Sequence, residues 1–220
     1  MRRRLGLPVL LAALAVATTG CDPIDVAASP SSWTPRPAPT VWPSIRDLTH
    51  YLPTEADGSA FGVGLTRAGP LVSEPPAALL RVCDLPQPWD ALVRYGAALT
   101  WQADGQEIRQ VIIAYGRVSA REVLDAIRAA LDSCGSFTYE GARYHRTSTV
   151  GTSAADATEA HEVFCTDRTP KAPPEHCFAL LASHDRLTQL AIPGGGKDIS
   201  AELNALVKVI SPFAIAVART

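Results

Sequence analysis

The sequence predicts an α+β fold in which an antiparallel β-sheet packs against two main helices. β-rich runs follow one another between short turns, two longer segments carry apolar residues at helical spacing, and four cysteines suit two disulfides. Paired β-rich runs are typical of antiparallel hairpins. Amphipathic helices bury one face, and a sheet offers the surface for it.

The clearest hairpin combines residues 92–102 with residues 108–115. The first run alternates between apolar and polar side chains, which is typical of a half-buried strand. Asp104 and Gly105 provide the turn, because both residue types tolerate the backbone conformation of a tight hairpin. The apolar side chains expected on one face of the first run are Val93, Tyr95, Ala97, Leu99 and Trp101.

A helix is predicted directly after this hairpin. Ser119 is a favoured N-cap, and Glu122 follows at the spacing of a capping box. Gly135 is expected to end the helix in the left-handed conformation, which places Cys134 at its C-terminal end. One helical face then carries Val123, Leu124, Ile127 and Leu131.

The second half of the chain predicts further strands and the second main helix. The strands are expected over residues 139–149, 161–166, 176–183 and 187–192. The helix is expected to begin near Ile199 or Ser200 and to end or kink at Pro212, because proline lacks the N–H that an interior turn needs. Shorter helices are expected over residues 45–52 and 77–81.

The N-terminus predicts export. Three arginines precede a short apolar run, and small residues lead to Cys21, so residues 1–20 are expected to be a lipoprotein-type signal peptide. The apolar run is shorter than the roughly 20 residues that span a membrane. Gly20 and Cys21 resemble a lipobox, in which the cysteine carries the lipid. Thr18 replaces the usual aliphatic residue, so ordinary secretion with Cys21 as a free thiol is the alternative.

Residues 21–44 are expected to be the lipidated cysteine and a proline-rich linker, and residues 45–220 a single extracytoplasmic domain. Such a proline-rich stretch favours an extended chain over a packed one. Removing residues 1–20 removes three of the 20 basic side chains and none of the 22 acidic ones. The remainder is acidic and has no basic stripe, so no nucleic-acid partner is expected.

Four cysteines remain after Cys21, and an even number in an exported domain indicates disulfides. Three pairings are possible. Cys165 and Cys177 flank a proline-rich loop between two β-rich runs, so we expect Cys165–Cys177 and, by remainder, Cys83–Cys134. Zinc is the alternative, but no Cys-x-x-Cys and no paired histidines occur, so neither a metal nor a cofactor is expected.

No motif in the chain specifies a reaction, and no catalytic residue is assigned. Gly-x-Ser-x-Gly and Ser-x-x-Lys are absent, and Asp198 follows Lys197 where a phosphate-binding loop needs Ser or Thr. A hydrolase would need His145 or His161 to meet a carboxylate in a cleft. The bulky residues near the hairpin are expected in the core, or else around a pocket for an apolar ligand. The candidate cleft residues are Tyr95, Trp101 and Tyr115.

Three segments carry a family resemblance: VSAREVLDAIRAALDSCGSF, EVFCTD and EHCFALLASHDRLTQLAIPG. Together with the cysteine order and the final helix, they resemble the extracellular sensor domain of PknH-type receptor Ser/Thr kinases, which also occurs as stand-alone lipoproteins in actinobacteria. The resemblance covers residues 75–218. It implies an α+β domain, disulfides joining the first cysteine to the second and the third to the fourth, a cleft proposed to bind a ligand, and no defined catalytic activity. Without a kinase region, phosphorylation is not implied here.

The sequence therefore predicts a non-catalytic sensor or ligand-binding lipoprotein of the cell envelope. Lipid on Cys21 would hold it at the outer face of the plasma membrane, with an unknown small molecule or envelope protein as its ligand. An envelope hydrolase with a His/Ser site and a protein-interaction module are the alternatives.

Overall fold

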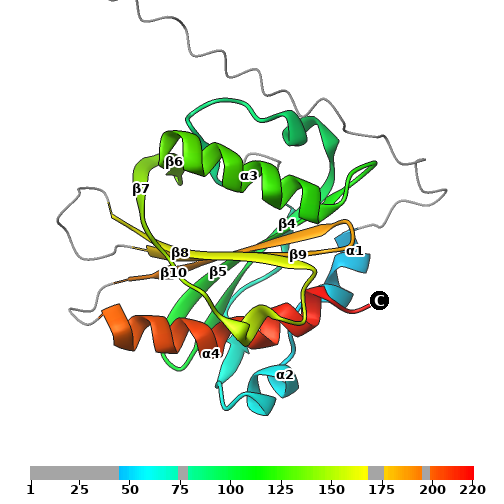
Figure 1. Cartoon of the computed structure of the whole chain (residues 1–220). Coiled ribbons are helices and arrows are strands. Elements are labelled where there is room, and N and C mark those ends of the chain that lie inside the picture. The colour runs from blue at the N-terminus through cyan, green and yellow to red at the C-terminus, as the bar shows by residue number, and fades with distance from the viewer. Residues whose placement is uncertain (1–44, 74–78, 168–175, 195–198) are drawn as a thin grey trace, which may run out of the picture. The chain divides into compact units, whose positions relative to one another are not determined.

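The computed structural model describes residues 45–73, 79–167, 176–194 and 199–220 (Figure 1). The signal peptide, Cys21 and the linker lie outside the described residues and stay predictions. Most of the loop between Cys165 and Cys177 and part of the glycine-rich loop before residue 199 also lie outside them.

Ten strands form one sheet in the described part of the chain, and all neighbouring pairs are antiparallel. Their bounds are β1 (Leu65–Arg67), β2 (Val72–Ser73), β3 (Arg81–Val82), β4 (Val93–Ala103), β5 (Gln106–Tyr115), β6 (Ser136–Tyr139), β7 (Ala142–Thr149), β8 (Ala160–Asp167), β9 (His176–Ser183) and β10 (Arg186–Pro193). The order across the sheet is β1-β4-β5-β10-β9-β8-β7-β6-β3, and β2 also pairs with β4. Short strands at the sheet edges limit the unpaired backbone there.

Two long helices, α3 (Ala120–Cys134) and α4 (Ile199–Val217), cover opposite faces of the sheet (Figure 1). Both pack on β9 and β10. The shorter helical segments are α1 (Ile45–Leu48), η1 (Thr49–Tyr51), α2 (Glu55–Ala60), η3 (Pro88–Leu92) and η4 (Ser153–Ala155). The predicted α+β fold is thus confirmed. Of the helices in these described ranges, none combines the length and apolar character needed to cross a membrane.

The sheet carries a hydrophobic core on each face. On the α3 side, Ile127 and Leu131 lie in one core with Phe178, and on the α4 side, Phe213 lies in a second core with Leu181. Successive residues of β9 alternate between these two cores. Because both faces are covered, this strand is apolar along its length and does not alternate in polarity.

Local signals in the sequence set three boundaries. Asp104 and Gly105 have φ of 49° and 85°, which makes the tight turn between β4 and β5. The Glu122 N–H donates to Ser119 Oγ at 3.2 Å and the Ser119 N–H donates to Glu122 Oε2 at 2.8 Å, so the capping box is confirmed. Gly135 ends α3 with φ of 64°.

Three expectations about elements need correction. The strand expected over residues 139–149 is confirmed as β7 from Ala142 onward, but its start was wrong, because Glu140 and Gly141 make a turn between β6 and β7 with φ of 48° and 78°. The helix over residues 77–81 is contradicted at Arg81, which lies in β3, while residues 77 and 78 lie outside the described residues. Val93 does not share a face with Tyr95, because a bulge between them sends the two side chains to different cores.

Helix α4 continues through Pro212 to Val217. A proline inside a helix removes one hydrogen bond and crowds the preceding turn. Here Pro212 is buried, and Phe213 and Ala214 after it lie in the α4-side core. Burial of this last stretch against the sheet offsets the local cost of the proline.

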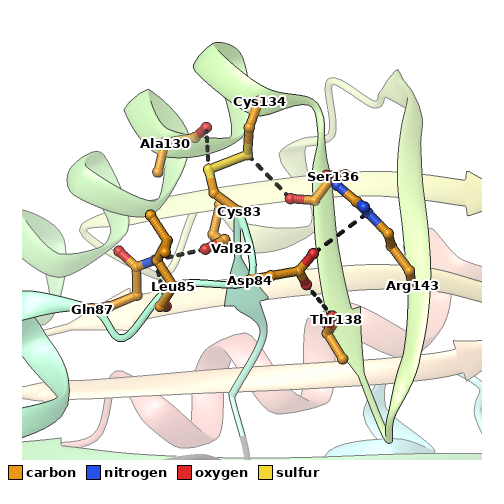
Figure 2. The surroundings of a disulfide bond; sticks show 10 residues. All are labelled: Val82, Cys83, Asp84, Leu85, Gln87, Ala130, Cys134, Ser136, Thr138 and Arg143. Atoms are coloured by element: carbon orange, nitrogen blue, oxygen red, sulfur yellow. Dashed lines mark hydrogen bonds and ion pairs between the residues drawn. A yellow bond between two sulfur atoms is a disulfide. The ribbon is translucent and has the colours of Figure 1, made fainter. Parts of the chain in front are cut away.

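Both expected disulfides are confirmed. Cys83 after β3 is joined to Cys134 at the end of α3, with their Cα atoms 5.7 Å apart (Figure 2). Cys165 and Cys177 are joined across β8 and β9, where they are direct register partners. The first bridge ties a helix end to an edge strand, and the second lies within the sheet.

The C-terminal end of α4 is tied to the segment that contains α1 and α2. The Arg219 guanidinium donates to the carbonyl oxygens of His50 (3.1 Å) and Leu52 (2.9 Å) and to Asp57 Oδ2 (2.5 Å). Arg186 lies 3.7 Å over the ring of Tyr51 and donates to the Arg219 carbonyl oxygen. These contacts join the N-terminal helical segment to the end of α4 and to β10, which lie far from it in sequence.

Candidate functional site

The three aromatic residues offered as a cleft do not meet. Trp101 is 4% exposed in the α4-side core, where its Nε1–H donates to Gln110 Oε1 at 2.8 Å. Tyr115 is 2% exposed in the α3-side core, on the other face of the sheet. Burial and the nearby Asp90 charge raise the pKa of the Tyr115 hydroxyl. Tyr95 is half-buried against the α4-side core. Their surroundings identify Trp101 and Tyr115 as core residues.

The histidines lie apart from one another. His145 is exposed on β7, His161 is half-buried on β8, and His184 is exposed at the β9–β10 turn, where Nδ1 lies 3.2 Å from Glu159 Oε1. His176 packs among aromatic rings at the start of β9. Among the described residues, no three His, Cys, Asp or Glu side chains gather in a way that suits a metal ion.

The described surface is hollowed beside the turn between β6 and β7. This hollow has a volume of about 310 Å³ and lies between that turn, β5 and the entry to β3. Its volume is at the lower end of the range of ligand pockets. Its lining consists of Leu79, Arg81, Arg109, Thr138, Tyr139, Glu140 and Gly141.

A second, smaller hollow of about 140 Å³ adjoins the first and shares Arg109, Tyr139 and Glu140 with it. Its other lining residues are Thr100, Glu107, His176, Ala191 and Pro193. The two hollows together form one candidate site, with three shared side chains at its centre.

An ion pair joins the two sides of this site. Arg109 Nη1 lies 2.9 Å from Glu140 Oε1. Arg109 lies on β5 and Glu140 in the turn before β7, and these two strands are separated in the sheet by β10, β9 and β8. The contact forms because β7 curves out of the plane of the central strands toward the α3 side (Figure 1). The side chains of Arg109 and Glu140 are 37% and 52% exposed. Exposed ion pairs contribute about 0–1 kcal/mol to stability, so this one is readily exchanged.

Tyr139 forms an aromatic wall beside the ion pair. Its ring lies 5.1 Å from the Phe178 ring and 5.9 Å from the His176 ring. Burial, and after it the negative charge of Glu140, raises the pKa of the Tyr139 hydroxyl, so the phenol is protonated at neutral pH. The wall is therefore uncharged and apolar, with a hydroxyl group.

Side-chain contacts and a disulfide stabilise the edge of the site at the end of β3. The Thr138 hydroxyl donates to Asp84 Oδ1, and Arg143 Nε lies 3.5 Å from Asp84 Oδ2 (Figure 2). Cys83 and Asp84 both have φ of 57°, a left-handed conformation that is uncommon for residues other than glycine. The disulfide and these contacts hold the end of β3 against β6.

The described lining of the site combines polar and apolar groups. It contains guanidinium groups, threonine and tyrosine hydroxyls, carboxylates, the His176 imidazole and apolar surface. The sequence prediction missed this site. A Glu-Gly pair after a tyrosine is a turn signal, but the contact of Glu140 with Arg109 depends on how the sheet curves.

Comparisons with known proteins found no matching family model and no matching curated protein. Among solved structures, the extracellular domain of PknH from Mycobacterium tuberculosis matches at 10% identity with a TM-score of 0.44, covering 77% of this chain and 96% of that one. An uncharacterized protein from Mycobacterium smegmatis matches at 12% identity with a TM-score of 0.40, covering 76% and 98%. No function is transferred at this level of similarity.

Proposed function

We propose that this chain is a non-catalytic ligand-binding or sensor domain of the cell envelope. In this proposal, lipid on Cys21 holds the protein at the outer face of the plasma membrane, and a small molecule occupies the candidate site. The observation that carries the proposal is the pair of adjoining hollows around Arg109, Tyr139 and Glu140.

The disulfides support the proposed location. Two disulfides are typical of proteins that fold in an oxidising compartment outside the cytoplasm. The export signal and Cys21 point the same way, and the linker would let the domain stand off the membrane.

The histidines considered for a hydrolase lie away from the site. His145, His161 and His184 lie on different strands or turns of the described residues and do not line either hollow. His176 does line the smaller hollow, but its ring packs edge-on against the rings of Tyr139 and Tyr144, which favours a role in packing.

Native mass spectrometry of the lipoprotein extracted from its own membrane tests this proposal. We expect a diacyl mass on Cys21, two disulfides and an additional small-molecule mass that collisional activation releases. The double variant Arg81→Ala/Arg109→Ala should lose the additional mass. Arg121→Ala is the matched control, because Arg121 is an exposed, ion-paired arginine on α3 away from the site. A small molecule retained equally by all three proteins, or by none, would contradict binding at this site.

A further inference from the structure

The larger of the two hollows favours an anionic ligand over a cationic one. In the larger hollow, Arg81 and Arg109 contribute two positive charges, and Glu140 contributes one negative charge. Within the described ranges, no acidic side chain forms an ion pair with Arg81 at the edge of β3. A guanidinium group binds carboxylates through a planar fork of N–H donors, which makes it a preferred partner for such groups.

A ligand anion can replace Glu140 in its ion pair with Arg109. Glu140 lies at the tip of a two-residue turn, and its contact with Arg109 is exposed to water. Because an exposed pair is worth little, an incoming anion with better geometry exchanges with Glu140 at small cost. Glu140 thus occupies the place where a ligand carboxylate would bind.

The neighbouring carboxylates limit the charge of that ligand. Glu107 and Glu140 both line the smaller hollow beside Arg109. Two nearby negative charges disfavour a doubly charged group such as a phosphate monoester. A single carboxylate satisfies Arg109 with less repulsion.

The rest of the site fits an apolar body. Leu79 and Tyr139 are both buried residues that line the larger hollow. Among the described residues, no atom lies within 4 Å of the position that a Cβ at Gly141 would take. We infer, on the basis of the proposed function, that the ligand is a small apolar monocarboxylic acid whose carboxylate displaces Glu140 from Arg109.

Two matched probes test this inference by titration calorimetry on the purified, oxidised protein: 2-naphthoate and its uncharged isostere 2-naphthamide. The wild-type protein should bind the acid about tenfold more tightly than the amide, because a hydrogen bond between two charged groups is stronger than one to a neutral group. Arg109→Gln should abolish this preference. Glu140→Gln should tighten acid binding several-fold and leave amide binding unchanged, and Arg121→Gln should change neither.

The gain of binding in Glu140→Gln cannot arise from misfolding, so it separates competition from simple structural damage. If the amide binds as tightly as the acid and Arg109→Gln weakens neither, the inferred ligand class is wrong. If neither probe binds the wild-type protein, the inference is also wrong. The proposed function is tested separately, by whether native mass spectrometry finds a small molecule bound to the protein from its own membrane.

Discussion

A tryptophan side chain can contact a ligand or pack in the core, and Trp101 packs in the core. Its indole ring packs edge-on against Phe213 at 5.8 Å between ring centroids, and its N–H reaches a buried glutamine on the neighbouring strand. Side chains point alternately to the two faces of every strand, so this periodicity does not identify a ligand site. The face of β4 that carries Trp101 is buried because α4, which lies far along the chain, packs on that side of the sheet.

Trp101→Phe should destabilise the protein by about 2 kcal/mol, because the buried Gln110 Oε1 loses its donor. Chemical denaturation measures this loss. Trp89→Phe is the matched control, since Trp89 is 3% exposed and its indole has no hydrogen bond within the described residues. Loss of naphthoate binding by Trp101→Phe at unchanged stability would instead place Trp101 in a ligand site.

Asp57 gives the protein a pH-dependent contribution to stability. Burial opposes its ionisation, but hydrogen bonds from Arg219 and Thr54 outweigh burial and hold the pKa of the Asp57 carboxyl below its ordinary value of 3.8. A carboxyl with a lowered folded-state pKa stabilises the fold above its unfolded-state pKa, and this contribution is lost as the pH falls through the folded-state value.

Asp57→Asn should therefore lower the free energy of unfolding at pH 7 by about 2 kcal/mol, the usual scale for a charged hydrogen bond. The difference from the wild type should shrink as the pH falls below about 4. Denaturant titrations at pH 7, 5 and 3 measure it. A difference that stayed constant with pH would show that Asp57 acts through packing and not through its charge.

At the scale of elements, the capping box of α3 is the strongest local signal in the chain. Ser119→Ala should cost about 1 kcal/mol of stability, because an N-cap hydroxyl satisfies a backbone N–H that otherwise lacks a partner. Ser133→Ala in the last turn of the same helix is the control and should change little. Thermal unfolding of the three proteins measures the effect, and equal stability would contradict the capping role.

Features that depend on neighbouring residues in the sequence could be predicted, and features that depend on contacts between distant parts of the chain could not. Ser119, Gly135 and the Asp104–Gly105 turn act on their own neighbours, so the sequence was enough to place them. Pro212 lies inside a helix because the core holds the residues around it. The Arg109–Glu140 contact joins strands that are not neighbours, and its position depends on the curvature of the whole sheet.

At the scale of the whole molecule, the two disulfides differ in exposure and in the length of chain that they close. Cys134 is exposed and Cys83 is half-buried, whereas Cys165 and Cys177 are 1% and 3% exposed. The pairs are separated by 51 and 12 residues in sequence. The pairing itself was predictable, because the second pair flanks a loop between adjacent strands, whereas the difference in exposure depends on the packing of α4.

A thiol reductant should therefore open Cys83–Cys134 first under native conditions, because attack on a disulfide requires access to a sulfur atom. Alkylation of the freed thiols followed by peptide mass mapping measures the order. Full reduction should then need partial unfolding of the β8–β9 region. Early labelling of Cys165 or Cys177 would contradict this order.

Loss of the exposed bridge should also cost more stability than loss of the buried one. Constraint of the unfolded chain grows with loop length, and it amounts to about 4 kcal/mol for the longer loop and about 3 kcal/mol for the shorter one. Cys83→Ser/Cys134→Ser should accordingly unfold at lower denaturant than Cys165→Ala/Cys177→Ala. The reverse order would mean that packing of the buried bridge in the α4-side core outweighs chain entropy. The first of these variants also connects stability to the candidate site: Cys83 lies two residues from Arg81, so releasing β3 should weaken naphthoate binding.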